Sequence, residues 1–251
     1  MSEQALLKNK QYCLLEGFPN SALTCALSTR HFQNMSLFYG DTKDALINRQ
    51  RFLGALGIDY LDLVCAKQIH SSQIRYAQEE DRGKGALSYD TAISDTDAFI
   101  TNKRRLPLAI FTADCLSIFL YDPITAAIGL IHAGWRSTRE NITAKTVQLM
   151  AEKFNTQAQD LYIGFGLAIR ACCYEVDKEF GNLFAYGLTE RFNRYYLDLA
   201  GINKKQLLDL GIKEINISDS KICTSCQNDD FFSYRKEGSS CGRMMSVMML
   251  P

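Results

Sequence analysis

Short apolar runs separated by polar turn residues recur along most of the chain, and this pattern predicts strands mixed with helices. Strands are expected over residues 61–65, 108–112, 117–121, 126–131, 161–165, 215–217 and 243–250. Helices are expected from Asp41 or Thr42 to Gly57, from a capping box at Ser137 and Glu140 to Phe154, and over residues 203–210. Strand–turn–strand order is as frequent as strand–helix–strand order, so the pattern favours an α+β fold with a mixed sheet and hairpins.

Composition narrows the class of protein. The chain has 251 residues with only four prolines, and no linker or internal repeat stands out, so a single domain over 1–251 is expected. Lys plus Arg and Asp plus Glu both number 28, which gives no electrostatic reason to expect nucleic acid or a membrane surface as a partner. The start carries no secretory pattern and no apolar run could span a bilayer, so a cytoplasmic monomer or small homo-oligomer is expected.

Two of the chain's three histidines stand in compact polar motifs, as does one cysteine. His70 follows a predicted strand, and Cys115 and His132 lie 17 residues apart at strand ends that a hairpin would bring together. Two imidazoles and one thiolate with a free fourth position are typical of a catalytic zinc site. The competing interpretation is that Cys115 is a small buried apolar residue and the histidines are polar residues near turns.

The remaining cysteines do not predict a disulfide framework, because the total of nine is odd and they are scattered along a long chain. Cys223 and Cys226 form a C-x-x-C, with Cys241 and the Cys172–Cys173 pair elsewhere. No second C-x-x-C or nearby histidine completes a zinc pattern. Unpaired structural thiols are therefore expected here rather than a second metal or redox site.

Arginines near these motifs are candidates for binding an anion. Arg49, Arg136 and Arg235 could hold phosphate or carboxylate, although each one alone could equally be a solvated surface charge. No Walker loop, dinucleotide fingerprint or nucleophile elbow is found, so no nucleotide cofactor is expected.

Together the motifs resemble those of the YfiH-like, or laccase-domain, family over nearly the whole chain. The shared segments are 36–49, Gln68–His70, Asp97–Thr101, Thr112–Cys115, His132–Arg136, Cys173–Val176, Cys223–Thr224, Phe232–Arg235 and Gly242–Arg243. The combination of Thr-Ala-Asp-Cys, His-Ala-Gly-Trp-Arg and an upstream Gln-x-His is specific to that family.

The resemblance implies a mixed β-sandwich covered by helices on both sides and a zinc-dependent purine nucleoside phosphorylase. Such an enzyme would cleave adenosine, inosine, guanosine or methylthioadenosine with phosphate, with adenosine deaminase as a side activity. The implied zinc ligands are His70, Cys115 and His132, and Cu²⁺ could enter the same site. Substrate or phosphate would be bound by Arg49, Gln68, Asp114, Arg136 and Arg235.

The chain departs from the family pattern at four places. Ser137 stands where glycine is usual, Leu167 where proline is usual and His31 in place of another glycine. Leu116-Ser117 follows Cys115 where the family often has an apolar residue and proline. All three implied ligands are kept, so metal binding is expected, and the changed loops near the pocket bear on substrate preference.

Other classes of function stay open at this point. A polyphenol oxidase-type copper enzyme needs a histidine-rich copper cluster in addition to a two-histidine, one-cysteine site, and only His31 is left to supply it. A metal-free cysteine hydrolase would use Cys115 as nucleophile with a histidine as base. A binding module without activity would use neither the trio nor the arginines.

Overall fold

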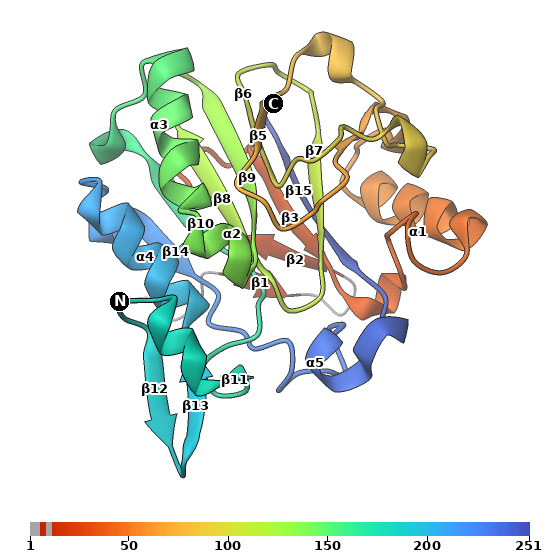
Figure 1. Cartoon of the computed structure of the whole chain (residues 1–251). Coiled ribbons are helices and arrows are strands. Elements are labelled where there is room, and N and C mark those ends of the chain that lie inside the picture. The colour runs from red at the N-terminus through yellow and green to blue at the C-terminus, as the bar shows by residue number, and fades with distance from the viewer. Residues whose placement is uncertain (1–5, 9–11) are drawn as a thin grey trace.

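Two six-stranded sheets lie face to face in the computed structural model, which describes residues 6–8 and 12–251 (Figure 1). The first sheet has the order β1 (Leu6–Lys8), β2 (Tyr12–Leu15), β3 (Thr24–Ser28), β15 (Met244–Met249), β7 (Leu108–Thr112) and β4 (Val64–Cys65). The second has the order β14 (Ile217–Asp219), β10 (Tyr162–Phe165), β8 (Leu116–Asp122), β9 (Ala127–Ala133), β6 (Ala98–Thr101) and β5 (Ile74–Tyr76).

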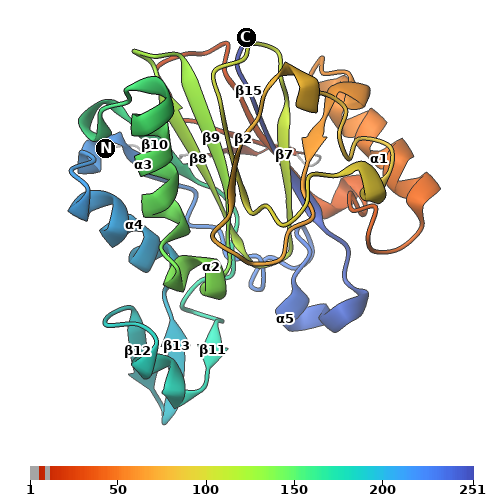
Figure 2. The ribbon, with the colours of Figure 1, turned by 45° about the horizontal axis from the view of Figure 1, so that its top comes forward.

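Both sheets are mixed. Most neighbouring strands are antiparallel, but β4 pairs with β7, β5 with β6 and β14 with β10 in parallel. A small third sheet, in the order β11 (Glu175–Val176), β13 (Arg194–Leu197) and β12 (Leu188–Arg191), extends away from the two large sheets (Figure 2). The sequence pattern did not predict this small sheet, because its strands are short and largely polar.

Apolar side chains from both large sheets form the central core. Leu108 and Ile110 of the first sheet belong to the same buried cluster as Phe99, Phe119 and Leu130 of the second. Burial of each such side chain stabilises the fold by about 1.5–3 kcal/mol. The core therefore fixes how the strand ends of the two sheets lie relative to one another.

Helices cover the outer faces of the sandwich. Phe52 and Leu53 of α1 (Thr42–Ala55) pack with Met245 and Val247 on the first sheet. Val147 and Met150 of α3 (Ile142–Phe154) and Leu207 of α4 (Leu199–Asp209) pack on the second. The short helices are α2 (Trp135–Arg139) and α5 (Tyr234–Glu237). This arrangement confirms the α+β sandwich flanked by helices.

Several predicted elements have different bounds. The strand over 61–65 shrinks to Val64–Cys65, because Asp59 caps a 3₁₀ turn at Tyr60–Asp62. The strand over 215–217 is mostly a 3₁₀ turn, Glu214–Asn216, and β14 begins at Ile217. In contrast, Asp41 caps α1 as predicted, since its side chain accepts hydrogen bonds from the backbone of Lys43 and Asp44.

The prediction that a capping box at Ser137 and Glu140 starts a helix was wrong. The chain forms two helices instead of one, and Asn141, in a left-handed conformation with φ of 60°, separates them. Ser137 lies inside α2, where its hydroxyl accepts a hydrogen bond of 3.0 Å from the backbone N–H of Gly134. Within the described ranges, no helix has the length and apolarity needed to cross a membrane.

Candidate metal centre

The β8–β9 hairpin brings Cys115 and His132 together. In its antiparallel register Leu116 pairs with Ala133 and Ser117 with His132, so Cys115, directly before β8, lies next to the end of β9. Asp114, just before the cysteine, has a positive φ of 89°. This conformation is uncommon for a residue with a side chain, and it turns the chain sharply between β7 and β8.

His70 reaches the same place from the loop between β4 and β5. Its φ of 61° is also in the left-handed region. The buried Asp97 carboxylate holds this loop by accepting hydrogen bonds from the backbone N–H groups of His70 at 3.0 Å and Ser71 at 2.7 Å. The two peptide hydrogen bonds to one charged acceptor offset the cost of this backbone conformation.

The donor atoms of His70, Cys115 and His132 converge. One ligand atom from each lies within 4.8 Å of the other two, and the Cys115 Sγ is 3.8 Å from the His70 Nε2. The two imidazole rings are 4.7 Å apart between centroids and inclined by 69°. These separations are those of three ligands around one ion, since zinc lies about 2.0–2.3 Å from nitrogen and sulfur donors.

Cys115 and His132 shift each other's pKa values in opposite directions. Burial opposes ionisation of the Cys115 thiol, but His132 and His70 outweigh burial and lower its pKa to about 6. Burial likewise opposes the charged form of His132, whereas the Cys115 thiolate and Asp97 raise its pKa to about 9. Cys115 is therefore a thiolate at neutral pH, which is the form that binds metals. A metal would replace the His132 proton between the two residues.

Asp97 also fixes the orientation of His132. Its Oδ1 lies 2.8 Å from the His132 Nδ1, and both side chains are almost fully buried. An imidazole that donates its Nδ1–H to a carboxylate presents its Nε2 to a metal, and such partners also raise ligand basicity. Asp97 is thus the residue that joins two of the three candidate ligands, because it holds the His70 loop as well.

The absence of a side chain at Gly134 leaves space for His70 and Cys115. A Cβ added at this position would lie 2.9 Å from the His70 Cδ2 and 3.2 Å from the Cys115 Sγ. Its N–H and the hydroxyl of the buried Ser137 form the contact that holds the turn after β9. Ser137 thus ties the backbone of the His-Ala-Gly-Trp-Arg motif into α2.

The trio lies in a pocket of about 780 Å³. Aromatic rings and arginines make up much of its wall. The aromatic residues are Phe38, Tyr39, Tyr89, Phe111, Trp135, Tyr174 and Tyr234, and the arginines are Arg136, Arg235 and Arg243. The size and lining suit a small molecule that has a flat apolar part and a negatively charged part.

Each pocket arginine lies against an aromatic ring. The guanidinium of Arg136 is 4.3 Å from the Trp135 ring centroid, and that of Arg243 is 4.0 Å from the Tyr39 centroid. The guanidinium of Arg235 lies 5.6 Å from the Tyr174 centroid and donates one hydrogen bond to the Glu175 carbonyl. Stacking holds the planar forks in place. The Arg243 guanidinium also donates hydrogen bonds to the carbonyls of Cys241 and Gly242, at 2.6 and 3.1 Å.

The other residues predicted from the sequence have different surroundings. Arg49 is not among the residues that line this pocket. It is 1% exposed and donates hydrogen bonds to the backbone carbonyls of Met35, Gly85 and Ala86. As placed, Arg49 supports the fold rather than phosphate binding. Its guanidinium also lies 4.7 Å from the Phe111 ring centroid.

Gln68 and Asp114 do line the pocket, and each is tied to the backbone or to a neighbouring loop. The Gln68 amide pairs with both the N–H and the carbonyl of Phe111, at 2.7 and 2.9 Å. The Asp114 carboxylate accepts hydrogen bonds from the Thr224 hydroxyl at 2.6 Å and the Arg235 N–H at 2.7 Å. These bonds position the pocket wall.

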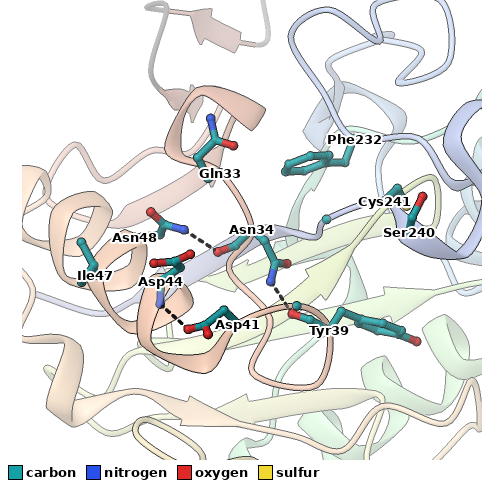
Figure 3. Close-up of a pocket in the computed structure, with 12 residues that line it drawn as sticks. Gln33, Asn34, Tyr39, Asp41, Asp44, Ile47, Asn48, Phe232, Ser240 and Cys241 are labelled. Carbon is teal, nitrogen blue, oxygen red and sulfur yellow. Dashed lines mark hydrogen bonds between the residues drawn. The ribbon is translucent and has the colours of Figure 1, made fainter.

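A smaller pocket of about 480 Å³ is lined in part by the loop at Tyr39, which also lines the main pocket (Figure 3). Asn34 holds this loop, since its amide donates to the carbonyl of Tyr39 at 2.5 Å while its backbone carbonyl accepts from Asn48 at 2.9 Å. The Asn34 Oδ1 also accepts from the N–H of Arg243 at 2.9 Å. The loop and the arginine therefore reach the main pocket as one unit.

Sequence reasoning gave no role to Asp97 or Arg243. A carboxylate directly before the apolar run Ala98–Ile100 was the signal for Asp97, because a charge in such a place needs a buried partner. Arg243 stood in one of the segments shared with the family, Gly242–Arg243, but its residue type alone did not place it in the pocket. His31 lies apart from the trio, 3.2 Å from Asp230, and Leu167 is buried in the central core.

Comparison with known proteins agrees with this fold. The sequence model of the family described as multi-copper polyphenol oxidoreductase laccase matches residues 24–251. A curated relative, the purine nucleoside phosphorylase YlmD of Geobacillus stearothermophilus, is 34% identical over 86% of this chain and 82% of its own. A second relative, adenosine deaminase RL5 of an unknown prokaryotic organism, is 28% identical over 84% of each chain.

A solved structure extends the comparison to three dimensions. The Bacillus licheniformis hypothetical protein YfiH superposes with a TM-score of 0.92, at 30% identity and over 98% of both chains. With the sequence match and the sandwich fold in agreement, the chain belongs to the YfiH-like family of multi-copper polyphenol oxidoreductase laccase proteins.

Proposed function

We propose that this protein is a zinc-dependent purine nucleoside phosphorylase with adenosine deaminase as a side activity. The observation that carries the proposal is the His70, Cys115 and His132 trio in a pocket walled by aromatic rings and arginines. The relatives named purine nucleoside phosphorylase and adenosine deaminase support the same substrate class. Adenosine, inosine, guanosine and methylthioadenosine are the nucleosides proposed, with phosphate as the second substrate.

The donor set fits Zn²⁺ in an open catalytic site. Three protein ligands leave a fourth position for water or substrate, and Asp97 orients His132 as the partners of zinc-bound histidines do. Bound zinc supplies Lewis-acid stabilisation of negative charge and lowers the pKa of a coordinated water. Cu²⁺ could occupy the same three ligands.

In phosphorolysis a phosphate oxygen bonds to C1′ of the ribose while the bond from C1′ to the base nitrogen breaks. The products are the 1-phosphate of the nucleoside's own sugar and the free base, which takes up a proton. Arg136, Arg235 and Arg243 would hold the phosphate, because guanidinium forks match phosphate oxygens and these three face one pocket. Substrates held next to each other react as an intramolecular pair, which removes much of the entropic cost.

The purine base would lie against the aromatic wall. Tyr39, Phe111 and Trp135 line the pocket, and their rings would pack against a planar base. An arginine guanidinium lies over each of these rings and holds it in orientation. Asp114 has both carboxylate oxygens engaged by Thr224 and Arg235, so its proposed task is to position the loop with Arg235. Gln68 likewise holds Phe111 in the wall.

A nucleoside panel tests the proposal. The protein is incubated with adenosine, inosine, guanosine or methylthioadenosine, each with and without phosphate, and free base, sugar phosphate and ammonia are measured. Release of base and sugar phosphate that requires phosphate is the expected result. Release of ammonia from adenosine without phosphate is the expected side reaction. A panel without any phosphate-dependent base release contradicts the proposal.

Matched variants locate the phosphate. Arg235→Met and Arg136→Met are expected to raise the KM for phosphate about tenfold or more, as the loss of a charged hydrogen bond of 1.5–3 kcal/mol would. Arg139→Met is the control, because Arg139 is an exposed arginine in the same short helix as Arg136 and does not line the pocket. Equal KM values in all three variants would remove the arginines from the phosphate site.

The alternatives have distinct outcomes. A copper oxidase of the multicopper type needs more histidines than this chain has, since two of its three are in the trio and His31 pairs with Asp230. A cysteine hydrolase would keep its activity after chelation, because Cys115 and His132 alone would supply the nucleophile and base. Full turnover of a chelated protein would favour that second class.

A further inference from the structure

Four cysteines outside the trio gather where two loops meet. Cys172 and Cys173 lie in the loop after β10, and Cys223 and Cys226 lie in the loop after β14. One sulfur from each lies within 4.8 Å of the other three. The Sγ of Cys226 is 3.5 Å from that of Cys172 and 3.3 Å from that of Cys173.

These separations match ligands around a metal rather than disulfides. A disulfide has a bond of about 2.05 Å, and all four thiols are free. Around a tetrahedral Zn²⁺ with bonds of about 2.3 Å, neighbouring sulfurs lie about 3.8 Å apart. The sequence did not predict the cluster, because the second pair is a Cys-Cys dipeptide rather than a second C-x-x-C.

The scaffold under the cluster is ordered by bonds that involve no metal. Ala168 and Cys223 form a parallel bridge, and the Thr224 N–H donates to the Ala168 carbonyl at 3.0 Å. Arg170 ties the loops further, through an ion pair of 2.7 Å with Asp219 and a hydrogen bond to the Ile222 carbonyl. Its backbone N–H also points at the Cys223 Sγ, 3.5 Å away. The loops therefore present four sulfurs as a preformed set.

We propose that Cys172, Cys173, Cys223 and Cys226 bind a second zinc ion as a closed tetrathiolate site. Thiolates are soft ligands that suit zinc, a tetrahedral four-sulfur set is typical of structural zinc sites, and four protein ligands leave no position for substrate. The site is structural. This assignment is independent of the proposed phosphorylase activity, because it uses none of the trio.

The two loops that the ion would join both lead into the main pocket. Cys173 precedes Tyr174, whose ring lines the pocket, and Cys223 precedes Thr224, whose hydroxyl holds Asp114 at 2.6 Å. The second zinc would fix one wall of the pocket relative to the Asp114 turn. Cys241, the other cysteine near the C-terminus, is not part of the cluster.

Zinc stoichiometry of the purified full-length chain tests the assignment. Wild-type protein is expected to hold two zinc ions, Cys226→Ser one, and His132→Ala one. Cys226 is exposed, so its replacement by serine spares the core. Cys241→Ala is the matched control and is expected to keep both ions. Unchanged zinc content in Cys226→Ser would overturn the assignment.

Two measurements on unmutated protein keep the test decisive if a variant fails to fold. Cobalt-substituted wild type is expected to show the intense thiolate-to-cobalt charge-transfer bands of a four-sulfur site. Intact mass under non-reducing conditions is expected to show four reduced cysteines in the cluster after zinc removal. A loss of two hydrogens for a Cys172–Cys226 or Cys173–Cys226 disulfide in freshly purified protein, with one zinc per chain, would contradict the proposal.

Discussion

The Asp97 carboxylate lies 2.8 Å from the His132 Nδ1 and also accepts the backbone N–H of His70. The buried Asp97 thus fixes the ring orientation of His132 and the conformation of the loop that carries His70. The trio is held by this contact and by the β8–β9 hairpin, so its geometry belongs to the folded chain before any metal binds.

Asp97→Asn is therefore expected to weaken zinc binding at the trio by about 10–100-fold, the usual cost of losing a carboxylate partner of a ligating histidine. Competition with a chromogenic chelator measures the affinity. Asp122→Asn is the control, because Asp122 is equally buried and caps the β8–β9 turn away from the trio. Equal zinc affinity in Asp97→Asn and wild type would exclude the positioning role.

Gly134→Ala is expected to displace His70 or Cys115, because the new Cβ would meet them at 2.9 and 3.2 Å. Metal content of the trio and turnover should fall together. Gly54→Ala is the matched control, since a Cβ there meets no atom within 4 Å, and in a helix it should stabilise the fold by up to about 1 kcal/mol. A Gly134→Ala protein with normal zinc content and normal turnover would contradict the packing argument.

Arg49→Met separates folding from phosphate binding. Loss of the guanidinium leaves three buried carbonyls without their donor, at about 1–3 kcal/mol each, so the free energy of unfolding should drop by about 3 kcal/mol or more. Denaturant unfolding measures the drop. The KM for phosphate should stay within twofold of wild type under conditions where the variant is folded. A raised KM with unchanged stability would return Arg49 to the phosphate site.

The sequence could predict the trio because its residues are rare and stand at strand ends. The hairpin between Cys115 and His132 followed from a turn at Asp122–Pro123 between two apolar runs. The structural role of Arg49 could not be predicted, because the sequence does not distinguish a buried arginine from a surface one. The backbone carbonyls that Arg49 binds are known only from the fold. The four-cysteine cluster was missed for a related reason. Its pairs are some 50 residues apart in the sequence, and they meet through the β10–β14 pairing and the bridge between Ala168 and Cys223.

Stability at acid pH should depend on Asp81, whose side chain is fully buried beside Arg75 and Lys84. Burial opposes its ionisation, but hydrogen bonds from Lys84, the Gln78 backbone and Arg75 outweigh burial and hold its pKa below the usual value. A carboxyl group whose pKa is lowered by folding stabilises the fold at pH values above its pKa in the unfolded chain, which is about 4. That contribution is lost as the pH falls through the lower pKa of the folded state. Wild type should thus exceed Asp81→Asn in stability at pH 7, and the difference should shrink toward pH 3.

Urea unfolding of both proteins across this range measures the difference. Asp90→Asn is the control, because Asp90 is an exposed residue of a nearby 3₁₀ turn. A difference in the free energy of unfolding between wild type and Asp81→Asn that stays constant from pH 7 to pH 3 would rule out the ion-pair explanation.

Metal reconstitution tests the central claim most directly. Wild-type protein is stripped with a chelator, zinc is returned in steps, and phosphate-dependent release of base from inosine or adenosine is followed beside zinc content, with Cys115→Ala treated in parallel. We predict that stripped wild type is inactive, that turnover returns with the trio's zinc, and that Cys115→Ala regains neither. Full turnover in the stripped protein, or in zinc-free Cys115→Ala, would contradict a metal centre at His70, Cys115 and His132.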